Sequence, residues 1–340
     1  MAARRGDTLL FERMPVIASH AAVGGKKEGE GPLAAEFDEL FPDNNCGQAN
    51  WETAEKNLQL RAARLCLKKA HATEKQVSLV LAGDLQAQCT ASSYALRELH
   101  LPFVGLFGAC STMAEALGLG AALCSAGLAD GLLAMTSSHF CAAERQFRTP
   151  LSYGAVRTPT AQWTATAAGC CLLHPAGQGV GIAAATFGRV EDYQIKDINN
   201  MGAAMAPAAA ATLLRYLRDT GQEPKDFDAI YTGDLGHLGS RLFREILTAE
   251  GLVMKNHIDC GSILYDAARQ NVKSGGSGPG CCAAVLCGHI LPRLERGSHR
   301  RVLFIATGAL MSQTTFLQKE SIPAIAHLVE LRGPECTARG

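Results

Sequence analysis

The sequence predicts an α/β protein made of two halves with a similar pattern. Two apolar segments, residues 77–85 and 227–235, both end in Gly-Asp-Leu and begin 150 residues apart. Near-continuous apolar runs of this length are typical of parallel strands that are buried on both faces. The shared pattern and the shared ending indicate an internal duplication.

A second match between the halves has an offset of 170 residues. In each copy a turn of small residues opens a helix, which leads to a glycine and then to an apolar strand. The matched positions are Gly108 with Gly278, Gly127 with Gly297, and the strand at 132–136 with the strand at 302–306. The offset increases because the second copy carries about twenty extra residues, near Asp259 to Lys273.

The helices predicted before the two Gly-Asp-Leu strands also correspond. The first is an amphipathic surface helix over residues 57–69, and the second covers residues 207–218 with Pro207 near its first turn. Strand, helix and strand in this order give right-handed parallel crossovers. We expect the halves to join between the apolar strands at 169–173 and 180–187. The predicted division is therefore an N-terminal half at residues 1–176 and a C-terminal half at residues 177–340.

The composition fits a compact, soluble protein and excludes several classes of function. The 340 residues are 47% hydrophobic and 19% charged, with a formal net charge of zero and no long basic run, so nucleic-acid binding is not expected. No apolar stretch is long enough to span a bilayer. Thirteen cysteines without a Cys-x-x-Cys pair predict reduced thiols and no metal site. The glycines of residues 24–32 lack the order of a phosphate-binding loop, and no cofactor is predicted.

Cys110 is the residue with the clearest chemical potential. It follows an apolar strand pattern and small residues, and it precedes a stretch that favours helix. A cysteine at the N-terminus of a helix lies near unpaired backbone N–H groups and the positive end of the helix dipole. This position either lowers the pKa of a thiol to make a nucleophile, or forms a cup that binds an anion. A buried and inert thiol is the third interpretation.

Several longer segments resemble a known family. They are residues 105–112, 137–139, 143–148, 158–164, 200–209, 306–310 and 318–320. The pattern resembles the thiolase-like superfamily, which contains thiolases and ketoacyl synthases, and within it the stage V sporulation protein AD family of endospore-forming bacteria. The resemblance implies a thiolase-like fold, in which two duplicated βαβαβ-type halves form a layered αβαβα sandwich, and a homodimer.

The same resemblance implies a function in sporulation. The protein would bind dipicolinic acid (pyridine-2,6-dicarboxylate) without catalysis and would support its uptake into the forespore. It would lie peripherally at the spore inner membrane, together with other stage V sporulation A proteins. Calcium is a possible companion of the ligand in the cell, but the sequence contains no cluster of carboxylates with the spacing of a calcium loop.

A thiolase or ketoacyl synthase-type acyl transferase is the alternative, with Cys110 as the nucleophile and His139 or His237 as its partner. Enzymes of this kind pair the cysteine with histidine and with a second histidine or asparagine. Residues 232–237 place a histidine three or four positions late, and residues 273–278 contain no asparagine. Asp234 would oppose formation of a thiolate. A retired active site that serves as a binding pocket therefore fits the sequence best.

The chemistry of dipicolinate suggests which residues hold it. One carboxylate would bind at the helix N-terminus that begins at Cys110, and the other at Arg145 or Arg148, because arginine grips a carboxylate with two parallel hydrogen bonds. Gln162 and Trp163 belong to the pocket wall or to an interface. A scaffold without a ligand would instead have side chains sealing the space around Cys110. The predicted ligand-binding residues are Cys110, Ser111, Thr112, His139, Arg145, Arg148, Asp234, His237 and Ser277.

Overall fold

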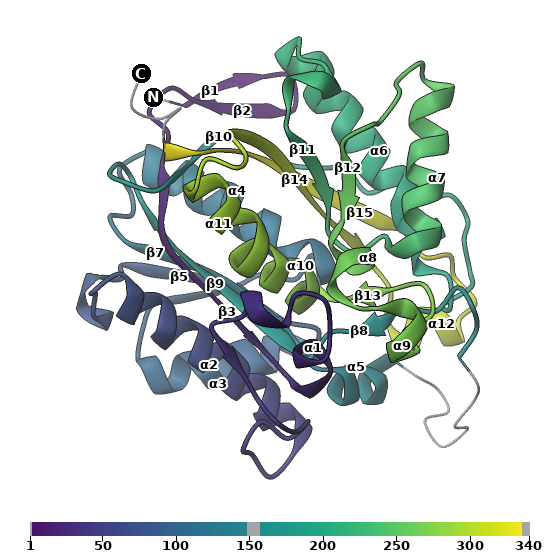
Figure 1. The fold of residues 1–340 in the computed structure, drawn as a ribbon, viewed down its shortest axis with the longest axis horizontal. Helices are drawn as coiled ribbons and strands as arrows, with labels where there is room; N and C mark the ends of the chain where they lie inside the picture. The colour runs from purple at the N-terminus through teal and green to yellow at the C-terminus, as the bar shows by residue number, and fades with distance from the viewer. Residues whose placement is uncertain (1, 148–156, 335–340) are drawn as a thin grey trace.

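The computed structural model describes residues 2–147 and 157–334, so the candidate Arg148 lies outside the described residues. Ten strands form the main path of one mixed sheet (Figure 1). The N-terminal half contributes β3 (Val16–Gly24), β5 (Leu79–Gly83), β6 (Phe103–Gly105), β7 (Leu132–Ser138) and β9 (Ala167–His174). The C-terminal half contributes β10 (Val180–Thr186), β11 (Ala229–Thr232), β12 (His257–Asp259), β14 (Arg301–Ala309) and β15 (Ala324–Arg332).

The strand order confirms the predicted duplication. The N-terminal strands run in the order β6-β5-β7-β9-β3, and the C-terminal strands in the order β12-β11-β14-β15-β10. When the five strands of each half are numbered along the chain, both orders read third, second, fourth, fifth, first. The first three strands in each order are parallel to one another, and the last two each pair antiparallel with the strand before them. The halves meet where β10 pairs with β3. The predicted division between residues 176 and 177 falls in the connection between β9 and β10.

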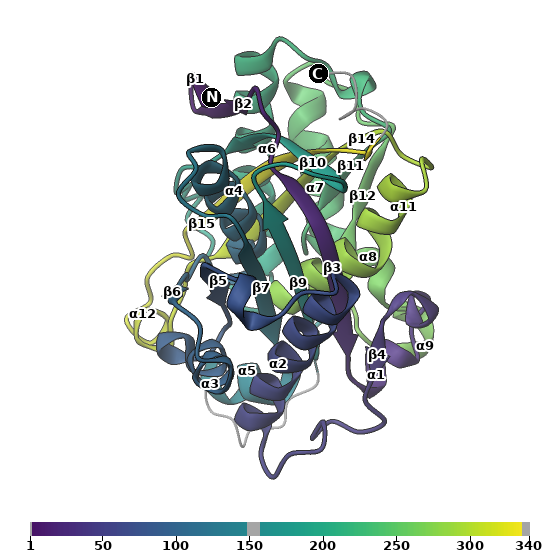
Figure 2. The same ribbon diagram turned by 90° about the vertical axis from the view of Figure 1, so that its left-hand side faces the viewer.

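The helices complete a sandwich of five layers, in which the strands of the two halves form two layers and helices form the two outer layers and the central one (Figures 1 and 2). α2 (Trp51–Lys69) and α3 (Thr90–Leu99) cover the outer face of the N-terminal strands, and α6 (Met201–Thr220) and α7 (Gly236–Ala249) cover the outer face of the C-terminal strands. Between the halves lie α4 (Thr112–Ser125), α10 (Pro279–Val285) and α11 (Leu291–Glu295), and a π-helical turn at Leu286–Ile290 joins α10 to α11. The thiolase-like fold class predicted from the sequence is confirmed.

The smaller elements lie at the edges and in the loops. They are β1 (Ala2–Arg5), β2 (Thr8–Phe11), β4 (Glu39–Leu40), β8 (Trp163–Thr164), β13 (Gly276–Ser277), α1 (Lys26–Gly29), α5 (Phe140–Phe147), α8 (Cys260–Leu264), α9 (Ala267–Gln270) and α12 (Gln313–Leu317). The extra residues predicted in the second copy form α8 and α9. The matched Gly127 and Gly297 have φ angles of 70° and 73°, a left-handed conformation that glycine adopts at low cost at the end of a helix.

Two predicted helix starts were wrong. The helix predicted from residue 57 begins at Trp51, as α2, because the Asn50 side chain caps it by accepting a hydrogen bond from the Thr53 N–H. Pro207 does not lie near the first turn of its helix, because α6 begins at Met201. The side chain of Asn200 caps this start by accepting a hydrogen bond from the Ala203 N–H. The helix continues through Pro207 because the residues around it pack in the core between α6 and the C-terminal strands.

Candidate functional site

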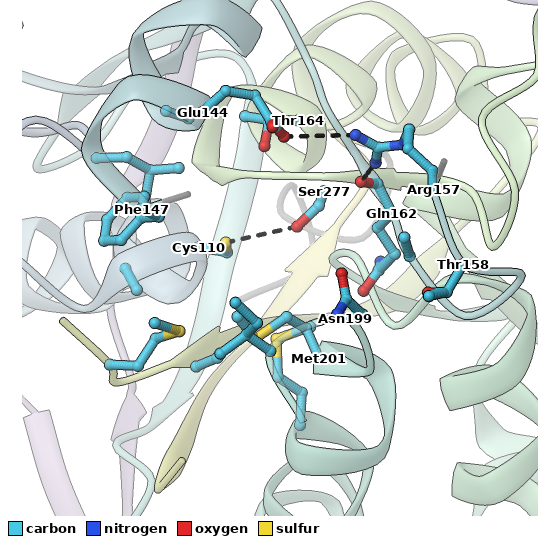
Figure 3. Close-up of a pocket in the computed structure, with 18 of the residues that line it drawn as sticks. Cys110, Glu144, Phe147, Arg157, Thr158, Gln162, Thr164, Asn199, Met201 and Ser277 are labelled. Atoms are coloured by element: carbon cyan, nitrogen blue, oxygen red, sulfur yellow. Dashed lines mark hydrogen bonds and ion pairs between the residues drawn. The ribbon is translucent and has the colours of Figure 1, made fainter. Parts of the chain in front are cut away.

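A cavity of about 350 Å³ lies where the two halves meet (Figure 3). Its size is at the lower end of the range for pockets that bind small molecules. The N-terminal half supplies Cys110, Phe107 and residues of α5, and the C-terminal half supplies Ser277, residues at the start of α6 and residues at the end of β14. The cavity argues against the scaffold hypothesis, which requires the space around Cys110 to be filled.

Cys110 lies in a tight turn before α4. A short 3₁₀ turn, Ala109–Ser111, links β6 to this helix, and Ala109 has a φ angle of 52°. This left-handed conformation is unfavourable for a residue with a side chain, so the surrounding contacts must hold it. The close approach of β14 is one such contact, because a Cβ on Gly308 would lie 2.2 Å from the Gly108 carbonyl oxygen.

Ser111 and Thr112 hold the same turn with their hydroxyl groups. The Ser111 hydroxyl donates to the Gly108 carbonyl at 2.6 Å, and the Thr112 hydroxyl donates to the Ala109 carbonyl at 2.7 Å. Both side chains are fully buried, and neither lines the cavity. The structure therefore places these two predicted ligand-binding residues in support of Cys110 rather than at the surface of the pocket.

Asp234 and Ser277 accompany the thiol. The Ser277 hydroxyl lies 4.0 Å from Cys110 Sγ and donates to Asp234 Oδ2 at 3.0 Å. The fully buried Asp234 carboxylate also accepts hydrogen bonds from the Gly278 N–H at 2.9 Å and the Thr307 hydroxyl at 2.8 Å. The carboxyl group of a protein side chain thus occupies the N-terminal end of α10, the position that would otherwise be open to an anion.

This arrangement keeps the thiol protonated. Burial and the neighbouring Asp234 carboxylate raise the pKa of Cys110 well above its ordinary value. Burial also raises the pKa of Asp234, while the hydrogen bonds that its carboxylate accepts act in the opposite direction. A ligand carboxylate placed next to Cys110 would lie close to Asp234, so the predicted anion cup at the start of α4 is a poor position for it.

The two candidate histidines lie elsewhere. His139 is buried, its Nε2 lies 2.7 Å from the Asn44 carbonyl oxygen, and its Nδ1 accepts a hydrogen bond from the Ala142 N–H. His237 is exposed on the first turn of α7. Within residues 2–147 and 157–334, no histidine lines the cavity. The imidazole that an acyl transferase would need is therefore not brought to the sulfur.

The predicted arginine also points away. Arg145 forms an ion pair with Glu52 at 2.8 Å, and its guanidinium lies 4.7 Å from the ring of Trp51 on α2. Arg157, which was not among the residues predicted from the sequence, lines the cavity instead. It lies 3.4 Å from Glu144 of α5 and donates to the Gln162 carbonyl (Figure 3).

Aromatic rings support Arg157. Phe140 and Trp163 stack with their ring centroids 3.6 Å apart and nearly parallel, and the Arg157 guanidinium lies 5.2 Å from the Trp163 ring. On the Trp163 ring, Lys27 makes a second cation–π contact at 4.4 Å. Such contacts favour a cation over an aromatic face. Trp163 therefore helps to position the one cation found among the described residues that line the cavity.

Gln162 forms part of the wall and connects two loops. Its Nε2 donates to the Asp234 carbonyl at 2.6 Å and to the Gly276 carbonyl at 2.9 Å. These two bonds fix the backbone on either side of the Asp234 and Ser277 pair. The sequence left two interpretations open for Gln162 and Trp163, the pocket wall or an interface. In the structure Gln162 lines the pocket, and Trp163 lies behind the wall, in contact with Arg157.

The described part of the chain holds neither a cluster of metal ligands nor a membrane-spanning helix. No group of three or more histidine, cysteine or acidic side chains in residues 2–147 and 157–334 is arranged to hold a metal ion. Over the same residues, no helix combines the length and the apolar character needed to cross a bilayer.

Similar solved structures define the class of protein. OleA from Xanthomonas campestris with bound cerulenin matches with a TM-score of 0.59, 15% identity and coverage of 97% of this chain and 99% of that chain. 3-Oxoacyl-[acyl-carrier-protein] synthase III from Aquifex aeolicus VF5 matches with a TM-score of 0.55, 10% identity and coverage of 94% and 99%. The fold is that of the thiolase-like proteins.

The sequence comparisons then identify the family. A family model described as Stage V sporulation protein AD (SpoVAD) matches residues 5–332. Stage V sporulation protein AD of Bacillus subtilis (strain 168) is 41% identical over 322 residues, which cover 94% of this chain and 95% of that protein. The chain belongs to the stage V sporulation protein AD family.

Proposed function

We propose that this sporulation protein binds dipicolinate in the cavity next to Cys110 and performs no acyl transfer there. The observation that carries the proposal is the pairing of Cys110 with a buried carboxylate, Asp234, in a cavity with an arginine on its wall. A protonated thiol is a weak nucleophile. A mostly buried guanidinium that already pairs with a carboxylate, that of Glu144, has the geometry to hold the carboxylate of an organic acid.

Arg157 is the group that we expect to bind a carboxylate. Its guanidinium is mostly buried, with a side-chain exposure of 13%, and its partner Glu144 is a carboxylate of the same chemical class as the ligand. A ligand carboxylate can therefore replace Glu144 as the partner of the Arg157 guanidinium, or share the N–H groups of that guanidinium with Glu144. The second ligand carboxylate would face the hydroxyl groups of Thr158 and Thr164 and the amide of Asn199, which line the same cavity.

The remaining parts of the proposal follow from family membership. We infer that the protein acts in the uptake of dipicolinate into the forespore, peripherally at the spore inner membrane, with other stage V sporulation A proteins as partners. Free dipicolinate and its calcium chelate are both candidate ligands. Glu144 would then contribute a carboxylate oxygen toward a calcium ion that enters with the ligand, because calcium prefers oxygen ligands.

The experiment that tests the proposal is calorimetric titration of the full chain with dipicolinate. Arg157→Ala should weaken binding by about 10- to 100-fold, because a hydrogen-bonded charged contact is worth roughly 1.5–3 kcal/mol. Arg157→Lys should recover part of the affinity, since lysine keeps the charge but cannot form two parallel bonds.

Arg145→Ala is the matched control, because Arg145 lies on the same segment of the chain but pairs with Glu52 outside the cavity. We expect its affinity to equal that of the wild type. Absence of dipicolinate binding by the wild type would refute the proposed function. Equal affinity of wild type and Arg157→Ala would refute the role of Arg157.

A further inference from the structure

Three methionines gather on one wall of the cavity. Met201 and Met205 lie one turn apart at the start of α6, and Met311 follows the end of β14. The chain has eight methionines, so this one cavity holds more than a third of them. Figure 3 shows Met201 on the side of the cavity away from Glu144 and Arg157. Met201 therefore lies across the cavity from the arginine, with Asn199 beside it.

The exposure of Met201 and Met311 separates these two side chains from the core methionines. Met113 and Met135, in the core, are fully buried, whereas Met201 and Met311 are only partly buried. Met205 is 1% exposed and anchors the group in the core beneath α6. Methionine fills gaps in a core because it is flexible, but two partly exposed methionines on a cavity wall have free contact surface.

Two phenylalanines line the cavity besides the methionines, whereas a third, Phe140, already has a stacking partner. Phe140 is stacked on Trp163, so its face is already covered on that side. Phe147 and Phe107 do line the cavity, and Phe107 is 49% exposed at the mouth. A flat ring whose carboxylate reaches Arg157 would extend from that polar wall toward the methionines.

We propose that Met201 and Met311, with the buried Met205 behind them, form a subsite that recognises the aromatic ring of the ligand, while Arg157 recognises its carboxylate. This inference rests on the proposed function and adds the determinant of specificity: the site selects planar aromatic acids over open-chain acids. The physical basis is the favourable contact between a thioether sulfur and an aromatic ring, together with the adaptable shape of the methionine side chain.

The test compares two ligands on the same variants. Glutarate separates its two carboxylates by three atoms, as dipicolinate does, but it has no ring. Calorimetric titration of the full chain should show tighter binding of dipicolinate than of glutarate. Met201→Leu and Met311→Leu, which keep the volume but remove the sulfur, should each weaken dipicolinate binding about 2- to 10-fold, as a sulfur–aromatic contact is worth roughly 0.3–1.5 kcal/mol. Glutarate binding should change less than twofold.

Met254→Leu is the matched control, because Met254 is a nearly buried methionine that does not line the cavity. Arg157→Ala should weaken the binding of both ligands, which separates the two sides of the site. Thermal unfolding of each variant checks that the fold is retained. Equal affinity of the wild type for the two ligands, or equal losses for both ligands in the methionine variants, would overturn the ring subsite and leave the proposed function intact. Failure of the wild type to bind dipicolinate would refute the proposed function itself.

Discussion

The Cys110 thiol and the Asp234 carboxylate lie on either side of one hydroxyl group, that of Ser277. Ser277 Oγ is 3.0 Å from Asp234 Oδ2 and 4.0 Å from Cys110 Sγ. A carboxylate at this position disfavours the thiolate, whereas an imidazolium would favour it. The turn before α4 therefore presents Cys110 in an electrostatic environment that disfavours the thiolate.

The first prediction concerns the reactivity of this thiol. We expect slow alkylation of Cys110 by iodoacetamide at neutral pH, because its pKa is raised by burial and by Asp234. Asp234→Asn removes the charge and keeps the shape, so it should lower the pKa of the thiol and speed alkylation. The alkylation rate of Cys110, measured at several pH values by mass spectrometry of the peptide that contains it, reports both effects.

Asp84→Asn supplies a control from within the molecule. Asp84 ends the matching Gly-Asp-Leu strand of the other half and accepts hydrogen bonds from Ser92 rather than facing Cys110. The Asp84→Asn substitution should therefore leave the alkylation rate of Cys110 unchanged. Fast alkylation of the wild type near pH 7, or stable acylation of Cys110 by an acyl-CoA followed by turnover, would contradict the binding-only proposal.

The second prediction concerns the outer edge of the sheet. Among the residues that the structure describes, β6 has β5 as its single paired neighbour, and Val104 on β6 is 44% exposed. Tyr94 on α3 and Phe107 after β6 are also exposed, at 46% and 49%. An open strand edge with apolar neighbours favours pairing with another chain. We propose that two copies pair along β6 as a homodimer, as the family resemblance led us to expect.

Light scattering after size-exclusion chromatography checks this proposal. The wild type should have the mass of two chains, and Val104→Lys should shift it toward one chain, because charge on an edge strand opposes pairing. Val253→Lys is the control, since Val253 is exposed at 68% on a loop away from this edge. A wild type that elutes with the mass of one chain at micromolar concentration would exclude the dimer.

The duplication could be predicted from the sequence because its signals are local. The Gly-Asp-Leu ending of a strand is a short motif that can be seen in the sequence, and so is the glycine that ends a helix of the central layer. The structure places the strands of the two halves in the same order. The position of Cys110 was equally visible, since the turn and the helix that follow it are coded by adjacent residues. Features that depend on long-range packing were less accessible.

The arginine of the site was missed for a specific physical reason. Residues 140–147 form the helix α5, whose period brings Ala143, Glu144 and Phe147 to the cavity and turns Arg145 toward α2. The sequence-based prediction chose Arg145 and Arg148 as the nearest cations after the strand at 132–136 and assigned no helix to this segment. Arg157 immediately precedes the segment 158–164 that carried the family resemblance, and that proximity was the available signal.

The last prediction concerns a buried carboxylate on the other side of the N-terminal strands. Glu55 on α2 is fully buried, and it accepts hydrogen bonds from Gln86 Nε2 at 2.8 Å and from the Ser137 hydroxyl at 3.0 Å. Burial, followed by the charge of nearby Asp84, raises the pKa of Glu55 from 4.5 to about 8. The folded protein therefore binds this proton more tightly than the unfolded chain does.

The sign of the pH dependence follows from this difference. Between pH 4.5 and about 8 the folded state keeps the Glu55 proton and the unfolded state releases it, so the contribution of Glu55 to the unfolding free energy decreases as the pH rises through this window. Its slope is at most about 1.4 kcal/mol per pH unit. Glu55→Gln keeps a neutral group of similar shape, so it should be increasingly stable relative to the wild type from pH 5 to pH 8.

Denaturant unfolding at several pH values measures this difference, and taking the variant minus the wild type removes the contributions of other buried carboxylates such as Asp234. Glu245→Gln on α7, where the side chain is 61% exposed, serves as the control and should run parallel to the wild type. A difference between Glu55→Gln and the wild type that stays constant with pH would mean that Glu55 is ionised in the folded protein, stabilised by Gln86 and Ser137 despite its burial.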